Sequence, residues 1–206
     1  MQKTSVAGVI LAGGRSRRMG GGLKALARLA GKPLIRHVID RVRPQVQSLA
    51  LSVEKYHPDF AAFDLPQVED PVPGNRGPLG GLLSALANME TGCDWMLLVP
   101  CDAPFLPLDL AIRLMECALD DDRAGCVVHY EAEIQPTFSI WHRRLLPRLE
   151  KAVLEESMAG FKQFLRGTEV AILEWKPSHP VPFFNINDPD ALAEAGRLLD
   201  PASAPI

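Results

Sequence analysis

The feature that most constrains the fold is an apolar run at residues 6–11 that leads directly into a glycine-rich stretch at residues 12–22. This stretch contains Arg15, Arg17 and Arg18, and Lys24 follows it closely. Glycine lets the backbone approach an anion, while Arg and Lys supply charge and several hydrogen-bond donors. A strand that ends in such a loop predicts an α/β protein with a site for a polyphosphate.

Two familiar phosphate-binding loops fit these residues poorly. A Walker A loop needs Ser or Thr directly after its lysine, but Lys24 is followed by Ala25. Residues 20–25 match the G-x-G-x-x-A dinucleotide pattern, yet they begin about nine residues beyond the predicted strand. The remaining alternative is a flexible turn beside a solvated basic face, which the joint occurrence of strand, loop and cations disfavours.

Length and composition predict one compact domain. The chain has 206 residues, of which 47% are hydrophobic, and we expect residues 1–200 to form a single α/β domain with a short tail at 201–206. No apolar run approaches the roughly 18 residues that span a bilayer. The N-terminus also lacks the pattern of a secretory signal. These features predict a cytoplasmic protein with no membrane partner.

Charge is distributed unevenly along the chain. Residues 1–43 contain ten Lys or Arg against the single acid Asp40, a net charge of +9, whereas the whole chain has −3 and the remainder therefore −12. Positive charge gathered around a glycine loop, with an acidic balance elsewhere, indicates a site for a small anionic ligand rather than a nucleic-acid surface.

The cysteines do not indicate a metal centre. Cys93, Cys101, Cys117 and Cys126 show neither C-x-x-C spacing nor a histidine at zinc-finger distance. We therefore expect reduced, packed thiols.

Hydrophobic patterns alternate between strand and helix along the chain. We expect helices to bury their apolar stripes in the core, including Leu108, Ile112 and Leu119 of the third helix. Alternation of this kind predicts a three-layer α/β/α fold with a mostly parallel, Rossmann-like central sheet. The expected strands are 6–11, 49–53, 67–68, 95–99, 125–130 and 137–141, and the expected helices are 33–42, 79–89, 108–119 and 188–199.

Carboxylates follow two of the predicted strands. Ligands of open α/β sheets bind outside the carboxyl ends of the strands, and Asp102 lies directly after the strand at 95–99. Asp102 is suited either to a Mg²⁺ ion, which takes one or two carboxylates together with phosphate oxygens, or to capping the next helix. Asp70 could bind a ribose or a guanidine-like edge, or orient the proline-rich loop that follows it.

Two further segments have alternative interpretations. Residues 74–81 contain four glycines that lead into a helix, and they favour close approach to a base or sugar over simple helix–sheet packing. Asn185 and Asn187 would share one face of an extended segment. That face could meet a second substrate or belong to an edge strand.

These motifs together resemble the molybdenum cofactor guanylyltransferases, within the nucleotide-diphospho-sugar transferase-like superfamily. The resemblance covers nearly the whole chain, and Gly14 is similar to the guanylyl-transferring branch rather than to the cytidylyl one. The motifs that carry it are Leu11-Ala12-Gly13-Gly14-x-Ser-x-Arg18-Met19-Gly20 with Lys24, Glu69-Asp70, Gly77-Pro78-Leu79-x-Gly81, Pro100-Cys101-Asp102 and Asn185-x-Asn187.

The resemblance implies transfer of GMP from GTP to molybdenum-bound molybdopterin, with release of pyrophosphate. Mg²⁺ would be the cofactor, and a molybdenum-insertion protein and an apo-molybdoenzyme or its chaperone would be partners. By the same resemblance, Asn185 and Asn187 would lie toward the pterin substrate. Catalysis would rest on Asp102, Lys24 and Arg18, with Asp102 as metal ligand, and the nucleotide would be bound by Leu11, Ala12, Gly13, Gly14, Lys24, Asp70 and Asp102.

Two positions depart from the family pattern: Leu23 stands where an aspartate is usual, and Ser52 where an asparagine is usual. Ser52 cannot make the paired hydrogen bonds of an amide. Two alternatives therefore stay open. One is a related nucleotidyltransferase that uses CTP or another phosphorylated acceptor, and the other is a catalytically weak nucleotide-binding or cofactor-handover protein.

Overall fold

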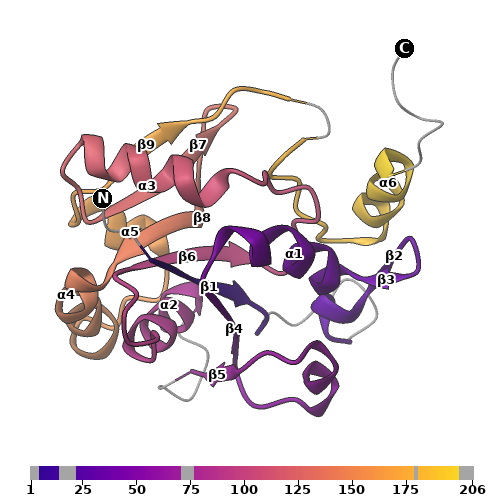
Figure 1. The fold of residues 1–206 in the computed structure, drawn as a ribbon, viewed down its shortest axis with the longest axis horizontal. Coiled ribbons are helices and arrows are strands. Elements are labelled where there is room, and N and C mark those ends of the chain that lie inside the picture. The colour runs from indigo at the N-terminus through magenta and orange to yellow at the C-terminus, as the bar shows by residue number, and fades with distance from the viewer. Residues whose placement is uncertain (1–4, 14–21, 71–76, 179–180, 200–206) are drawn as a thin grey trace.

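A seven-stranded sheet forms the centre of the protein (Figure 1), which a computed structural model describes over residues 5–13, 22–70, 77–178 and 181–199. The strand order is β5-β4-β1-β6-β8-β7-β9, and a separate two-stranded ribbon pairs β2 with β3. The strands are β1 (Val6–Leu11), β2 (Arg28–Leu29), β3 (Lys32–Pro33), β4 (Ser48–Val53), β5 (Gln67–Glu69), β6 (Trp95–Pro100), β7 (Gly125–Tyr130), β8 (Glu133–His142) and β9 (Ala171–Glu174).

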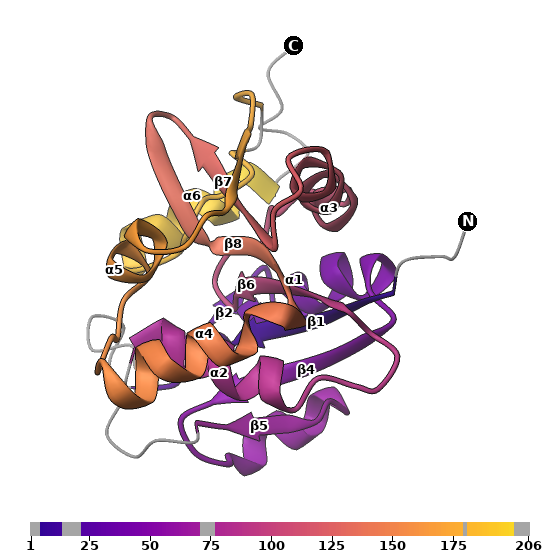
Figure 2. The ribbon, with the colours of Figure 1, turned by 90° about the vertical axis from the view of Figure 1, so that its left-hand side faces the viewer.

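Helices cover both faces of this sheet (Figure 2), with α1 and α3 on one face and α2, α4 and α5 on the other. The α-helices are α1 (Leu34–Val42), α2 (Gly77–Ala87), α3 (Leu110–Asp120), α4 (Leu146–Glu150), α5 (Phe161–Arg166) and α6 (Pro189–Leu199). Short 3-10 turns occupy Lys24–Leu26, Arg43–Gln45, Pro58–Phe63 and Arg143–Leu145, and a π turn occupies Lys151–Glu155. None of the helices in the described ranges is long and apolar enough to cross a membrane.

The two-residue period of a strand explains the three layers. Val6 and Ile10 of β1 pack against the side of α1 and α3, whereas Ala7 and Val9 pack against the side of α2 and α4. Successive side chains of a strand point to opposite faces, so a strand that is apolar at every position needs cover on both. The predicted α/β/α architecture is confirmed. The predicted tail at 201–206 lies outside the described residues.

One strand breaks the parallel arrangement. Among the paired strands of the large sheet, β8 runs antiparallel to both β6 and β7, while the β1–β4, β1–β6, β4–β5 and β7–β9 pairs are parallel. The expected strand at 137–141 is therefore part of a longer hairpin arm. Its turn consists of Glu131 and Ala132 with φ of 49° and 65°, a left-handed conformation for which Gly or Asn is the usual sequence signal.

Other expectations need correction. Leu108 (60% exposed), Ile112 and Leu119 are exposed, because Leu108 lies in the turn before α3, and Ile112 and Leu119 lie away from the side that α3 buries in the core. The first helix begins at Leu34, one residue later than expected. Residues 183–188 form no strand, and the elements α4, α5 and β9 were not predicted. The four cysteines are free, as expected.

The core around β8 offers a test of stability. Trp141 is completely buried and stacks on Phe161 with ring centroids 5.9 Å apart, and its indole N–H donates to the Ser139 hydroxyl at 2.7 Å. Ser139→Ala is expected to lower the free energy of unfolding by about 1–3 kcal/mol, because a buried donor loses its acceptor. Urea unfolding measures this loss, with Ser178→Ala at an exposed serine as control. Equal midpoints for the two variants would contradict it.

Candidate nucleotide site

The carboxyl ends of three neighbouring strands meet at one edge of the sheet. Leu11 of β1 is paired with Ser52 of β4 on one side and with Pro100 of β6 on the other. Hydrogen bonds extend this pairing past the strands, from Ala12 N to Ser52 O (2.8 Å) and from Cys101 N to Leu11 O (3.2 Å). The strand order reverses around β1, and such a switch point is where open α/β sheets bind ligands.

A cavity of about 400 Å³ opens at this edge. Of the predicted nucleotide-binding residues, Ala12 is buried and lines a neighbouring cavity rather than this one, while Gly14 and the predicted catalytic residue Arg18 lie outside the described residues. The cavity is lined by the predicted residues Leu11, Gly13, Lys24, Asp70 and Asp102, together with Ser52, Val53, Glu54, Gly77, Pro78, Gly81, Pro100 and Cys101. Residues from four separate stretches of sequence thus share one site.

Asp70 presents an unsatisfied carboxylate at this site. Its backbone N–H donates to Val53 O at 3.1 Å, which places the residue beside the end of β4, and its Oδ1 atom is buried with no hydrogen-bond partner among the residues that the structure describes. Burial, and then the charge of Glu54, raise the pKa of Asp70 above its ordinary value. A carboxylate held in this way is unfavourable without a ligand. It is suited to accept hydrogen bonds from one.

Glycines of α2 make room for this arrangement. A Cβ atom at Gly80 would lie 2.6 Å from Asp70 Oδ1, and one at Gly81 would lie 2.6 Å from Ser52 Oγ. The helix can therefore approach the strand ends only because these residues lack side chains. The close packing of α2 on the strand ends agrees with the packing interpretation. Gly77, Pro78 and Gly81 also line the cavity, and close approach to a base or sugar stays a prediction.

Lys24 connects the site to the C-terminal part of the chain. Its ammonium group contacts Asp102 Oδ2 and donates to Asn187 Oδ1 at 2.6 Å. The Lys24 side chain is only 13% exposed. The predicted phosphate-binding lysine, the predicted metal ligand and one predicted acceptor-binding residue are thus in direct contact.

The segment that carries Asn187 is docked rather than paired in a sheet. The Ile186 N–H donates to Asp102 O at 3.0 Å, and the buried Ile186 side chain packs with Leu29, Leu34 and Phe105. The backbone then enters α6, where Asp188 Oδ1 accepts from Ala191 N at 2.9 Å as the predicted helix cap. The alternative that this segment is an edge strand is therefore wrong, since these residues contact a loop after β6. Asn185 Oδ1 is buried and has no hydrogen-bond partner among the described residues.

Asp102 fits a hard divalent cation. Within the described part of the chain its Oδ1 atom is buried without a hydrogen-bond partner, while Lys24 contacts Oδ2. The alternative role as a helix cap does not apply, because the residue at the start of α3 is Asp109. In the described ranges, no three His, Cys, Asp or Glu side chains gather as a cation cage. A single carboxylate is consistent with an ion that takes most of its other ligands from phosphate and water.

The thiol beside Asp102 is not a nucleophile. Cys101 is buried, and burial followed by the neighbouring Asp102 charge raises the pKa of its thiol far above the ordinary value. Since the thiolate is the reactive form, this cysteine stays protonated and inert.

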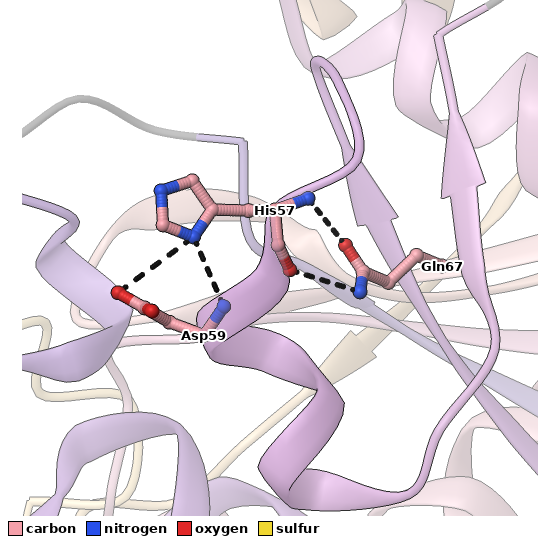
Figure 3. A network of polar contacts seen from close by, with 3 residues as sticks. All are labelled: His57, Asp59 and Gln67. Carbon is pink, nitrogen blue, oxygen red and sulfur yellow. Dashed lines mark hydrogen bonds and ion pairs between the residues drawn. The ribbon is translucent and has the colours of Figure 1, made fainter.

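A second cavity of about 870 Å³ shares Gly13 and Lys24 with the first. Figure 3 shows the loop on its wall, where the backbone of His57 exchanges two hydrogen bonds with the Gln67 side chain, at 2.9 and 3.1 Å. The ring atom Nδ1 of His57 accepts from Asp59 N at 3.3 Å. These contacts anchor the wall to β5. Lys24 lies where the two cavities meet.

Two residues at or beside the site, Glu54 and Gly80, were not singled out from the sequence. Glu54 follows β4 and acts on Asp70 through its charge, and its place at a strand end was a usable signal. Gly80 was read only as part of a glycine run. Leu23, where the family usually has an aspartate, packs as a partly buried side chain against the core beside α1.

The fold and the site together define a nucleotide-binding α/β protein of the nucleotidyltransferase type. A family model described as the MobA-like NTP transferase domain matches residues 8–173. The chain belongs to this family and is a nucleotidyltransferase. Enzymes of the family generally use a divalent metal ion.

Curated relatives agree with this assignment. The chain is 40% identical over 193 residues to a protein named molybdenum cofactor guanylyltransferase from Rhodopseudomonas palustris (strain BisB5), covering 92% of each chain. It is 34% identical to one of the same name from Vibrio cholerae serotype O1, covering 96% of this chain and 95% of the relative. The solved structure of molybdopterin-guanine dinucleotide biosynthesis protein A from Archaeoglobus fulgidus shares the fold, with a TM-score of 0.77, 21% identity, and coverage of 94% and 97% of the two chains.

The close approach of Gly80 to Asp70 leads to a prediction about binding. In Gly80→Ala the new methyl group must displace the Asp70 carboxylate, so we expect GTP to bind about ten-fold more weakly. Gly196→Ala is the matched helical control, because its Cβ would meet no atom within 4 Å. The control should raise the free energy of unfolding by about 0.5–1 kcal/mol and leave GTP binding unchanged. Calorimetric titration measures the GTP affinity, and urea unfolding measures the free energy of unfolding. Unaltered GTP affinity in Gly80→Ala would show that GTP binding does not depend on the close approach of Gly80 to Asp70.

Proposed function

We propose that this protein transfers GMP from GTP to the terminal phosphate of molybdenum-bound molybdopterin and releases pyrophosphate. The observation that carries the proposal is that Lys24 contacts both Asp102 and Asn187 at the mouth of a cavity containing Asp70. The names of the curated relatives support the choice of substrates.

Asp70 would select the guanine base. The edge of guanine offers N–H donors at N1 and N2, and an ionised carboxylate accepts such a pair with both oxygens. The unsatisfied Oδ1 of Asp70 lies beside Gly80 of α2, and Asp70 lines the cavity together with Ser52 and Gly81. Cytosine and adenine present different donors and acceptors at the corresponding edges, so the same carboxylate disfavours them.

The start of the glycine loop would contact the nucleotide through its backbone. Gly13 suits this role, since a Cβ there would lie 3.0 Å from Glu54 N. Lys24 would neutralise the phosphates where the two cavities meet. Gly14 and Arg18, which lie outside the described residues, stay predicted to bind the nucleotide and to take part in catalysis.

Asp102 would hold a Mg²⁺ ion through its free carboxylate oxygen. When bound, the ion supplies charge neutralisation at the reacting phosphates. Lys24 would contribute a second positive charge, and the chain would keep the reactants in line.

The transfer itself requires no covalent enzyme intermediate. An oxygen of the acceptor phosphate attacks the α-phosphorus of GTP, and the bond from that phosphorus to the β-phosphate oxygen breaks as pyrophosphate leaves. The Cys101 thiol stays protonated, so it does not compete with the acceptor phosphate as a nucleophile. Asn185 and Asn187 would bind the acceptor on the side of the docked C-terminal segment.

The test is the release of pyrophosphate from GTP and Mg²⁺, with and without molybdenum-loaded molybdopterin. Release that needs the acceptor supports the proposal, and parallel reactions with CTP and ATP measure base selectivity. GTP binding without release under all conditions would contradict it. A molybdenum-insertion protein as donor and an apo-molybdoenzyme or its chaperone as recipient are the protein partners that this reaction would require, in the cytoplasm.

A further inference from the structure

Lys24 is shared between two parts of the site that must bind different substrates. Its ammonium group has three N–H donors, one directed at Asp102 Oδ2 in the cavity and one at Asn187 Oδ1 on the docked segment. The lysine and Asn187 are 163 residues apart in the sequence. The docked segment also lies beyond residues 8–173, to which the NTP transferase family model applies.

We propose that Lys24 couples nucleotide binding to the acceptor side of the site by releasing Asn187 when a triphosphate arrives. This inference rests on the proposed function. Without nucleotide, the amide oxygen of Asn187 is occupied by the lysine. With nucleotide bound, the lysine turns to the phosphates and the amide becomes available to the acceptor.

The choice of which contact breaks follows from charge. A phosphate oxygen is an anionic acceptor, so its attraction to the ammonium group includes a charge–charge interaction that a neutral acceptor lacks. The Asn187 amide is neutral, so it is the weaker of the partners available to the ammonium group. The Lys24 side chain is only 13% exposed, and little water therefore screens this competition.

The segment itself need not leave its place when the contact breaks. The Ile186 N–H stays bound to Asp102 O, its side chain stays buried against Leu29 and Phe105, and Asp188 caps α6. Only the exposed Asn187 side chain is released. The coupling therefore acts on one amide group that a firmly held backbone presents toward the acceptor.

The test measures whether the GTP affinity rises or falls when the Asn187 amide is removed. If GTP must break the Lys24–Asn187 bond, removal of the amide relieves this cost, and Asn187→Ala should bind Mg-GTP about five-fold more tightly than the unaltered protein. The same variant should turn over more slowly at saturating GTP, because the acceptor loses a contact. Calorimetric titration measures the affinity, and acceptor-dependent pyrophosphate release measures the turnover.

A matched control and a spectroscopic readout sharpen the result. Asn88→Ala removes an exposed asparagine at the end of α2, where its amide donates to Ser84 O, and should leave GTP affinity unchanged. The side-chain amide NMR signal of Asn187, assigned by its loss in Asn187→Ala, should shift on saturation with Mg-GTP. Unchanged or weaker GTP binding in Asn187→Ala, or an unmoved amide signal, would overturn the coupling. Failure of the unaltered protein to bind Mg-GTP would instead overturn the proposed function.

Discussion

Asp102→Ala is expected to lower the rate of acceptor-dependent pyrophosphate release by about 1,000-fold or more. The substitution removes the free carboxylate oxygen proposed for the metal and the partner that holds Lys24 in the site. Loss of a single preorganised electrostatic group costs about 100- to 1,000-fold in rate, and Asp102 would position two. Single-turnover kinetics at saturating Mg-GTP isolate this effect on the chemical step.

Asp109→Ala is the control for this experiment. Asp109 precedes α3, and its side chain lies 4.0 Å from that of Arg113, outside the cavity. It should retain full turnover. The backbone carbonyl of Asp102, which binds Ile186, is unchanged by the substitution, so the fold of Asp102→Ala should be preserved. A turnover within ten-fold of the unaltered protein would exclude Asp102 from the catalytic role.

Asp70→Asn is expected to weaken GTP binding by about 100-fold while leaving the affinity for other nucleoside triphosphates nearly unchanged. An amide of the same shape offers one oxygen and two unwanted donors to the guanine edge. Sites built to hydrogen-bond a substrate lose specificity steeply when one partner becomes mismatched. Competitive titration of GTP, CTP and ATP measures the change, and equal loss for all three would show that Asp70 does not read the base.

The substitution that weakens GTP binding should not lower the stability of the ligand-free protein. Since burial and Glu54 raise the pKa of Asp70 in the folded state, its ionised form at neutral pH opposes folding, and the contribution becomes more favourable as the pH falls through the folded pKa. Asp70→Asn should thus unfold at the same or a higher urea concentration. GTP binding should weaken as protonation begins, at a higher pH than an ordinary aspartate requires. In Asp70→Asn, GTP binding should lack the part of this pH dependence that protonation of Asp70 causes.

The sequence predicted the strand-end site because its logic is local. Lys24, Asp70 and Asp102 each follow an apolar run, and parallel strands bring their carboxyl ends to one edge, so the structure places all three in one cavity. The same reasoning predicted the layers, because strands such as β1 are apolar on both faces.

The parts that were not predicted depend on contacts between distant segments. The Glu131–Ala132 turn contains no glycine, so the sequence lacks the usual signal for the hairpin that makes β8 antiparallel to β7. The docking of Asn187 on Lys24 depends on packing of Ile186 under the β2–β3 ribbon and α1. A pattern of alternating apolar and amide residues has the period of a strand, but packing and the Asp102 carbonyl determine its conformation instead.

The docked C-terminal segment has a consequence for biosynthesis. Residues 183–188 leave the ribosome after every strand of the large sheet. Lys24, Asp70 and Asp102, with the other residues that line the cavity, are synthesised before Ile186, whose N–H binds the Asp102 carbonyl. A chain that terminated before this segment would therefore contain every residue of the cavity and would lack Asn187, the amide proposed to meet the acceptor.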